Sequence, residues 1–181
     1  VDHFKCGHTE ATQELWAKDP QLKADYEQLF ATARQNSGNS VMQKATYIIP
    51  VVFHIIHEYG SENITDAQIY DQMAVLNRDY RKRNADTTEL VAGFDTIAAD
   101  ANIEFRLATI DPWGNCTNGI EHIYSHETNI GDAYSKLNQW HRSRYLNVWV
   151  VKSIEGAAGY AHYPSDTEGG GFFRDGIVIL H

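Results

Sequence analysis

The chain has 181 residues, 43% of them apolar and 22% charged, which is enough apolar surface for one folded domain and argues against general disorder. Its formal net charge of −9 repels phosphate backbones, so nucleic acid is not expected as a partner. The longest strongly apolar stretch, Ile48–Ile56, is too short to cross a bilayer, so no membrane partner is expected either. The two cysteines, Cys6 and Cys116, cannot form a disulfide scaffold.

The first 34 residues are predicted to be helical. Asp19 followed by Pro20 indicates a helix start, since Asp caps well and proline suits the first helical position. The helix that follows has apolar residues on one face, at Leu22, Tyr26, Leu29, Phe30 and Ala33. The small and polar residues Gln35–Ser40 then predict a linker, the kind of segment in which proteolytic sites concentrate.

A β-rich region begins near Tyr47. Ile48–Ile56 is a β-branched run typical of a buried strand. Thr65 and Gln68 form a capping box, and the apolar spacing that follows predicts a helix of about four turns. The same signals predict short helices near Asp95–Ala99 and at Asp132–Trp140, a flexible loop at Gly169–Gly171, and strands at Ile103–Ile110, Ile120–Tyr124, Leu146–Val151, Ala158–Tyr163 and Gly176–Leu180.

Strands that alternate with helical connections define an α/β fold. The strands are too apolar for a sheet with one wet face, so we expect helices to cover both faces at least in part. The chain stops at His181, directly after an apolar strand, and we expect it to be the front part of a longer protein.

The nine histidines raise the question of a metal site. His54 and His57 are three apart in a strand and should point to opposite faces, which favours two hydrogen-bonded structural histidines. His122 and His126 are four apart, but the glutamate of the zinc motif H-E-x-x-H is replaced by Ile123, so we interpret them as a surface pair.

Two segments are better candidates for chemistry. Lys5-Cys6-Gly7-His8 places a lysine beside a thiol, which favours the metal-binding thiolate, and Gly7 allows close backbone approach. The segment Gly156–Pro164 is rich in small residues and ends in proline, which indicates an edge strand able to receive an extended peptide. An ordinary free cysteine and an ordinary edge strand stay open as alternatives.

Six segments in register resemble the pappalysin family of metzincin zinc metallopeptidases, in particular its secreted bacterial members. The resemblance covers about residues 47–181. Its segments are Ile49–His57, Asn102–Ala108, Asp111–Ile120, Leu146–Val150, Gly159–Pro164 and Asp175–Ile179.

The resemblance implies the upper subdomain of a metzincin catalytic domain at 46–181: a mostly parallel twisted sheet, one antiparallel edge strand and backing helices. In that fold the edge strand holds the backbone of a protein or peptide substrate. The strand falls here on Gly159, Tyr160, Ala161, His162 and Tyr163.

The resemblance also implies a zymogen with a helical propeptide at 1–45. In such secreted precursors an N-terminal cysteine ligates the catalytic zinc and acts as a cysteine switch, a role that would fall on Cys6. Relatives favour cleavage before arginine or lysine, so we expect the bond between Ala33 and Arg34 to be the activation site.

The family signature H-E-x-x-H-x-x-G-x-x-H does not occur in these 181 residues. The family order places it shortly after the strand that begins at Gly176, so we expect the zinc ligands and the general base in a C-terminal part of the same protein. Calcium is a further cofactor that the resemblance implies, largely in that part, and a partner for Cys116 is expected there as well. The expected location is extracellular.

Two other functions fit the residues. The chain could be a non-catalytic module that binds extended peptides at an open edge strand. A metal-binding protein that uses the nine histidines is the weaker alternative.

Overall fold

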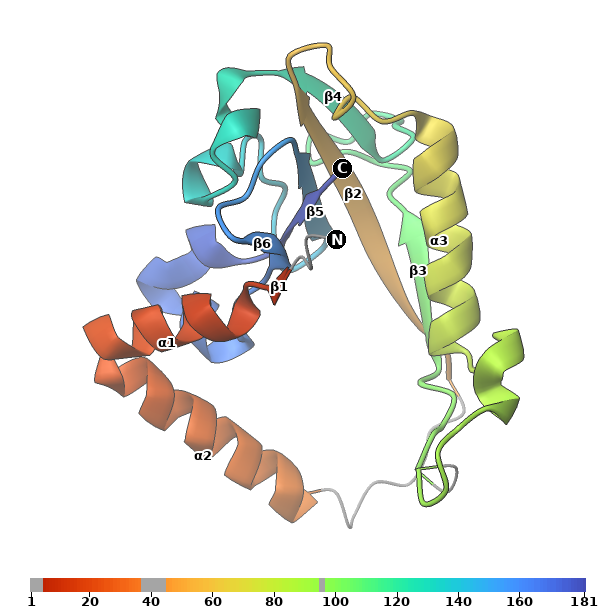
Figure 1. Cartoon of the computed structure of the whole chain (residues 1–181), viewed down its shortest axis with the longest axis vertical. Helices are drawn as coiled ribbons and strands as arrows, with labels where there is room; N and C mark the ends of the chain where they lie inside the picture. Colours follow the sequence, from red (N-terminus) through yellow and green to blue (C-terminus); the bar gives the residue numbers. More distant parts are fainter. Residues whose placement is uncertain (1–4, 37–44, 95–96) are drawn as a thin grey trace.

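A computed structural model describes residues 5–36, 45–94 and 97–181 (Figure 1). The elements in chain order are β1 (Lys5–Cys6), α1 (His8–Lys18), α2 (Pro20–Asn36), β2 (Tyr47–His57), α3 (Asp66–Tyr80), β3 (Ile103–Leu107), β4 (Ile120–Tyr124), β5 (Leu146–Val151), β6 (Ala157–Tyr160) and β7 (Ile177–Leu180). Short 3₁₀ helices occur at Ala85–Thr88, His126–Asn129, Ala133–Ser135, Pro164–Thr167 and Gly169–Arg174.

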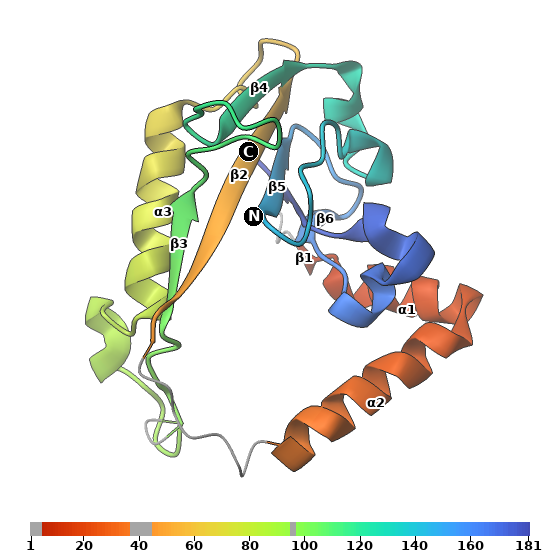
Figure 2. The ribbon, with the colours of Figure 1, turned by 180° about the vertical axis from the view of Figure 1, so that it is seen from behind.

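The strands form one sheet in the order β1-β6-β7-β5-β2-β3, and β4 also pairs with β2. All of these pairs are parallel except β6 with β7, which are antiparallel. The predicted α/β class and the mostly parallel sheet with one antiparallel strand near its edge are therefore confirmed. The α1–α2 hairpin lies at the β1–β6 end of the sheet, and α3 lies at the β3 end (Figures 1 and 2).

The long strand β2 divides the core between the two faces of the sheet. Val51, Phe53 and Ile55 point to the face that α3 covers with Ile69 and Met73. The alternate residues of β2 point to the opposite face, as the period of two in a strand requires. The capping box predicted at the start of α3 is present, and the helix begins where it indicates.

The second face is covered differently from the prediction. Instead of α-helices, the irregular segment 125–145 packs there and carries only 3₁₀ turns. The expected helix Asp132–Trp140 is reduced to Ala133–Ser135, because Asn138 adopts a left-handed conformation with φ of 53° and the buried Ser135 hydroxyl donates to the Glu127 carbonyl. Trp140 still reaches the core with 2% of its surface exposed.

Other predicted boundaries also changed. The strand predicted at Ile103–Ile110 ends at Leu107, and the one predicted at Ala158–Tyr163 ends at Tyr160, because Pro164 opens a 3₁₀ helix soon after. Gly169–Gly171 is not a loose loop but the start of a 3₁₀ helix in which Gly171 packs against the backbone of residue 166. Part of the expected helix at Asp95–Ala99 and most of the expected linker lie outside the described residues.

No helix in the described part of the chain combines the length and the apolar character that a bilayer-spanning segment needs.

Candidate functional site

The predicted substrate-binding strand is β6, and its position is set by β7. Gly159 pairs with Ile179 and Tyr160 with Val178 in antiparallel register. A Cβ added to Gly159 would lie 2.8 Å from the Val178 carbonyl oxygen, so the two strands approach too closely there for any side chain. Ala161, His162 and Tyr163 continue beyond the strand without ladder pairing, so the predicted segment is only partly a β-strand.

The outer edge of β6 is occupied by the chain's own N-terminus. Cys6 of β1 lies opposite Gly159 in parallel register, and the Gly7 amide donates to the Gly159 carbonyl at 2.9 Å. Gly7 must lack a side chain here, since a Cβ would lie 2.7 Å from the Ala157 Cβ. Nδ1 of His8 donates to the Ala161 carbonyl at 2.6 Å, which extends the contact beyond the strand. The expectation of an open edge for peptide binding is therefore wrong for this chain.

Aromatic side chains attach the α1–α2 hairpin to Tyr163. The ring of Tyr26 from α2 lies 4.4 Å from the Tyr163 ring, and that of Trp16 from α1 is stacked on it at 6.0 Å. The His8 ring meets the same tyrosine edge-on at 4.5 Å. A hydrogen bond with Tyr26 raises the pKa of the Tyr163 hydroxyl. Tyr163 is thus contacted by two residues of α1, His8 and Trp16, and by Tyr26 of α2.

A polar contact accompanies this aromatic cluster. The Trp16 indole N–H donates to Oδ1 of Asp166 at 3.1 Å. Asp166 is fully buried, and its second oxygen has no hydrogen-bond partner in the described structure. The hydroxyl of Thr12, one turn before Trp16 on α1 and 4% exposed, is also without a partner. Hydrophobic, polar and main-chain contacts therefore all hold the N-terminal segment.

A half-buried lysine lies against the ring of Tyr160 in β6. Nζ of Lys136 donates to the carbonyls of Arg174 and Asp175 and lies 5.5 Å from the Trp149 ring and 5.7 Å from the Tyr160 ring. Burial lowers the pKa of Lys136 to about 8. Burial also raises the pKa of Tyr160. The lysine thus joins the backbone that leads into β7 to the ring of a β6 residue.

His162 is kept neutral by its surroundings. Burial is the main cause that lowers its pKa to about 4, and the charges of Lys136, Arg174 and His8 act in the same direction. The carboxylate of Asp166 opposes them but does not offset the burial. Its buried Nδ1 atom has no hydrogen-bond partner in the described structure.

The residues present do not by themselves form a metal centre. Cys6 and Cys116 are free, exposed thiols. Within residues 5–36, 45–94 and 97–181, no three His, Cys, Asp or Glu side chains are grouped so that they could hold a metal ion. A zinc site needs about four ligands, so Cys6 beside β6 would need further ligands from outside the described residues.

The histidine pairs have the structural roles that were predicted. His54 and His57 are buried on opposite faces of β2, and each makes a hydrogen bond within the protein. His122 and His126 lie at the surface, each beside a carboxylate. The metal-binding alternative built on these histidines finds no support in the described residues.

The ring nitrogens of His54 reveal a network that the sequence reasoning missed. Nδ1 lies 2.7 Å from Oε2 of Glu121, and Nε2 lies 3.0 Å from Oδ1 of Asn147. The Glu121 carboxylate also accepts from the side chains of Asn138 and Trp140. A histidine within an apolar strand was the signal available, but its partners are 67 and 93 residues away in the sequence.

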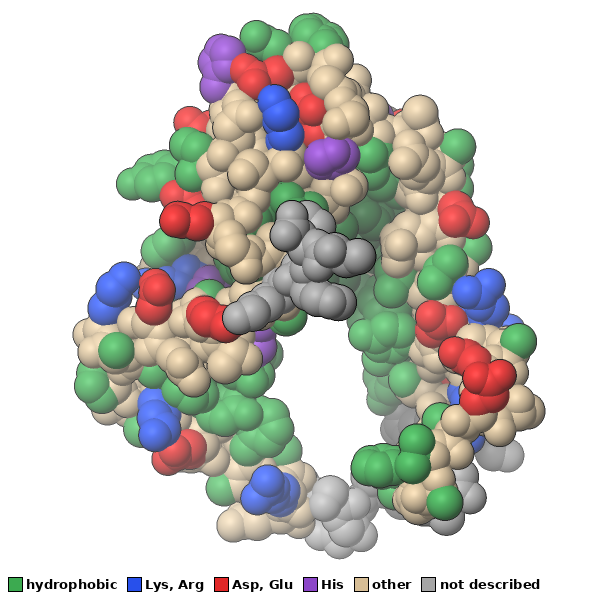
Figure 3. Space-filling model, viewed as in Figure 1, with side chains coloured by type: hydrophobic (Ala, Val, Ile, Leu, Met, Phe, Trp, Pro, Cys, Tyr) green, Lys and Arg blue, Asp and Glu red, His purple; other side chains and the backbone are tan. Residues whose placement is uncertain are grey.

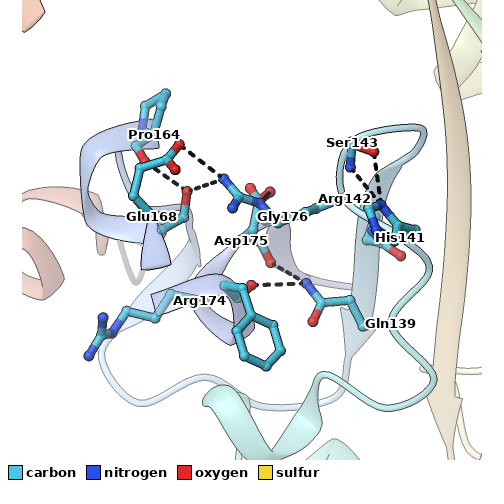
Figure 4. A network of polar contacts seen from close by, with 12 residues as sticks. Gln139, His141, Arg142, Ser143, Pro164, Glu168, Arg174, Asp175 and Gly176 are labelled. Atoms are coloured by element: carbon cyan, nitrogen blue, oxygen red, sulfur yellow. Dashed lines mark hydrogen bonds and ion pairs between the residues drawn. The ribbon is translucent and has the colours of Figure 1, made fainter. Parts of the chain in front are cut away.

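A second polar network surrounds a pocket of about 660 Å³ lined in part by Trp140, Arg142, Glu168 and Phe172. Arg142 donates to Asp175 at 2.8 Å and to Thr167 at 2.9 Å, as Figure 4 shows. These bonds join the loop before β5 to the turn before β7. The pocket includes neither Cys6 nor any residue of the predicted substrate strand.

The predicted activation bond lies in the last turns of α2. Ala33 and Arg34 are both exposed, but the helix runs on to Asn36 rather than ending before a linker at Gln35. Helix ends fray readily, so this bond is accessible only after the last turn unwinds.

No protein-family model matches the chain. Among solved structures, promirolysin of Tannerella forsythia is 32% identical and superposes with a TM-score of 0.84, covering 97% of this chain and 59% of its own. Mature mirolysin of the same organism, in complex with a cleaved peptide, is 38% identical with a TM-score of 0.70, covering 75% of this chain and 53% of its own. The predicted resemblance to the pappalysin family is thereby confirmed.

Curated relatives are more distant. Extracellular metalloproteases of Colletotrichum graminicola and Verticillium alfalfae are each 26% identical, over 75% and 97% of this chain. The chain spans only 41% and 54% of their lengths, about half of the relatives it matches.

Proposed function

We propose that this chain is the front part of the latent precursor of a secreted zinc endopeptidase that acts on proteins or peptides. The similarity to mirolysin, promirolysin and the extracellular metalloproteases supports the reaction class and the extracellular location. The observation that carries the proposal is the pairing of β1 with β6, because it fills the strand on which a peptide substrate would align.

The proposed division is a propeptide at 1–45 and an upper catalytic subdomain at 46–181. Promirolysin covers 97% of the chain but mature mirolysin only 75%, and the difference is close to the size of this propeptide. β1 and α1 contact β6, and α2 contacts the 3₁₀ helix Pro164–Thr167 that follows it before running away from the sheet (Figure 1).

In the proposed latent state, residues around Cys6 block the site in two ways. The backbone of Cys6 and Gly7 occupies the edge of β6, and a substrate cannot add to that edge while they remain. The Cys6 thiolate, a ligand that zinc prefers, would complete the coordination of a zinc ion held by histidines from a C-terminal part of the protein. The reaction's ligands and general base would come from that part, and Gly159–Tyr163 would align the substrate.

The sheet itself offers a place for such a C-terminal part. Ile49, Leu146, Ile177 and Ile179 are only partly buried, on the same face of the sheet that α3 covers farther along. Figure 3 shows an opening between the α1–α2 hairpin and the β2–β3 side of the molecule, with hydrophobic side chains along its wall. An apolar strip of this kind fits the buried face of a further helix.

Substitution of Cys6 in the full-length precursor tests the proposal, and the second free thiol is a matched control. Cys6→Ala should shorten the lag before peptidase activity, whereas Cys116→Ala should leave it unchanged. In the parent precursor, Cys6 should resist alkylation until a chelator removes zinc. A Cys6→Ala precursor as latent as its parent would contradict the switch.

N-terminal sequencing of the activated product tests the cleavage site. We expect the mature chain to begin at or near Arg34. A mature N-terminus elsewhere would show that the bond at Ala33 is not the activation bond, and would leave the blocking role of β1 untouched.

A further inference from the structure

We propose that the N-terminal segment is a ligand in its own right: after the chain is cut near Arg34, residues 6–30 remain bound to a docking surface formed by Gly159, Ala161, Tyr163 and Asp166. The segment of one molecule can therefore also bind, and block, a cut copy in trans. This inference rests on the proposed function for its biological meaning, but the binding itself does not require catalysis or a metal.

The contacts that hold the N-terminal segment all lie before the predicted cut. The main-chain bonds are made by residues 6–8, the indole bond and one aromatic contact by Trp16, and the α2 contact by Tyr26, which in turn packs on Phe30 at 4.5 Å. All of these positions precede the predicted cut at Ala33–Arg34. Cleavage therefore removes the covalent link and leaves these contacts in place.

These contacts combine strand pairing, aromatic packing and a hydrogen bond to a buried carboxylate. Two residues of strand pairing give direction and register, as in the addition of an extended peptide to a sheet edge. The ring of Tyr163 packs against the rings of His8, Trp16 and Tyr26. Aromatic side chains such as these are enriched at the hot spots of protein interfaces. Trp16 adds a hydrogen bond to the buried Asp166 carboxylate, which loses a partner if the segment leaves.

The docking surface extends past the end of β6. Tyr163 and Asp166 lie beyond the last residue of β6, Tyr160, and Asp166 lies outside the segment Gly159–Tyr163 that would align a substrate. They are met by both helices, so a piece that contains only α1 would retain Trp16 but lose Tyr26. The partner that fits this surface is therefore the complete strand–helix–helix segment rather than a short extended peptide.

The consequence is that the cut alone does not expose β6. While it is covalently linked, the segment has an effective concentration in the millimolar range at its docking surface. After the cut, its binding becomes an ordinary bimolecular equilibrium that weakens on dilution. Complete exposure of the strand would then need dilution or destruction of the released segment, for example by a second cut between α1 and α2.

The experiment uses the whole chain with a recognition sequence for a site-specific endopeptidase placed at Gln35–Ser40. After cleavage, size-exclusion chromatography and native mass spectrometry at about 10 μM should show the N-terminal fragment bound to the remainder, since sub-micromolar complexes stay associated at that concentration. A fluorescent peptide of residues 1–34 should exchange into the cut protein. A fragment that elutes apart, whatever the state of the remainder, would overturn the proposal.

Variants identify the docking surface. Tyr26→Ala should weaken binding of the labelled peptide about tenfold or more, and Trp16→Phe, which keeps a ring but removes the indole donor, by a smaller factor of about five. Tyr70→Ala, which removes a half-exposed tyrosine on α3, is the control and should bind as the parent does. Equal binding by all three variants would also overturn the proposal.

A cut Cys6→Ala chain separates this inference from the proposed function. The fragment should still co-elute, because the docking contacts described above do not involve the thiol. If the full-length Cys6→Ala precursor stays latent while its cut fragment stays bound, the proposed switch fails and the docking surface stands. If loss of the thiol alone frees the fragment, the docking surface fails.

Discussion

His54 and Glu121 form a pair inside the sheet, with 2.7 Å between Nδ1 and Oε2 and no exposed surface on the histidine. Asn147 presents its oxygen to Nε2, because its amide nitrogen is already committed to the Trp140 carbonyl. Both ring nitrogens thus face side-chain oxygens that other hydrogen bonds hold in place. The two contacts fix the orientation of the buried ring between β4 and β5.

Replacement of this carboxylate is expected to destabilise the fold. Glu121→Gln should lower the free energy of unfolding by about 1–2 kcal/mol, because it replaces the carboxylate in the hydrogen bonds with His54, Asn138 and Trp140 by a neutral amide. Although burial opposes it, the hydrogen bond with His54 lowers the pKa of Glu121, so this contribution is present above pH 4.5 and is lost as the pH falls below that value. Urea unfolding measures it, with the exposed Glu155→Gln as control; equal stability of the two variants would refute the pair.

A single methyl group should displace the N-terminal strand. Gly7→Ala places a Cβ 2.7 Å from the Ala157 Cβ, so β1 must move away from β6. Hydrogen exchange at the amide of residue 7 should become at least about tenfold faster, since that amide donates to Gly159 only when the strands are in contact. The exposed Gln13→Ala on α1 is the matched control. Unchanged protection in Gly7→Ala would show that the strands tolerate the side chain.

Stability should fall in mild acid because of His162. Its folded-state pKa of about 4 lies below the ordinary value of 6.5, so the unfolded chain binds the proton first and stability is lost as the pH falls from 6.5 towards 4. After allowance for partial solvent screening, the loss is about 1–2 kcal/mol. The group is faced by Lys136, Asp166, Arg174 and His8.

His162→Asn should remove this part of the pH dependence, whereas His126→Asn, at an exposed histidine, should keep it. Thermal unfolding between pH 7 and pH 4 gives the comparison. Parallel curves for His162→Asn and the parent protein would exclude His162 as the source.

Lys136→Met should loosen the turn that leads into β7. The variant keeps an apolar side chain between Trp149 and Tyr160 but removes the donor to the carbonyls of Arg174 and Asp175, and we expect a loss of about 1–2 kcal/mol. Equilibrium unfolding beside the exposed Lys152→Met gives the test; equal stability of the two variants would contradict the bracing role.

Local signals in the sequence predicted most of the elements. The β-branched run of β2 and the capping box of α3 each specify one structure, because local preference and tertiary packing agree there. The segment 132–140 was predicted wrongly because buried polar contacts, such as that of Ser135, replaced the regular helix. Periodicity describes one element at a time and does not report such contacts.

The candidate site was predicted only in its parts. Cys6 and the Gly159–Tyr163 segment were identified separately, but their pairing joins residues about 150 positions apart and depends on one glycine at each side. Tyr163 was expected to contact substrate rather than to hold the hairpin, because nothing local links it to Trp16 or Tyr26. The buried state of Asp166 likewise depends on the helices that cover it.

The order in which the strands are synthesised has a consequence for folding in the cell. His8 precedes its partner Ala161 by 153 residues, so the covering segment has left the ribosome long before β6 is made. Unpaired strand edges invite aggregation, and a nascent chain is most vulnerable while such an edge waits for its neighbour. Here the neighbour has already been synthesised when the edge emerges, so β1 is available to cover β6 as soon as that strand pairs with β7.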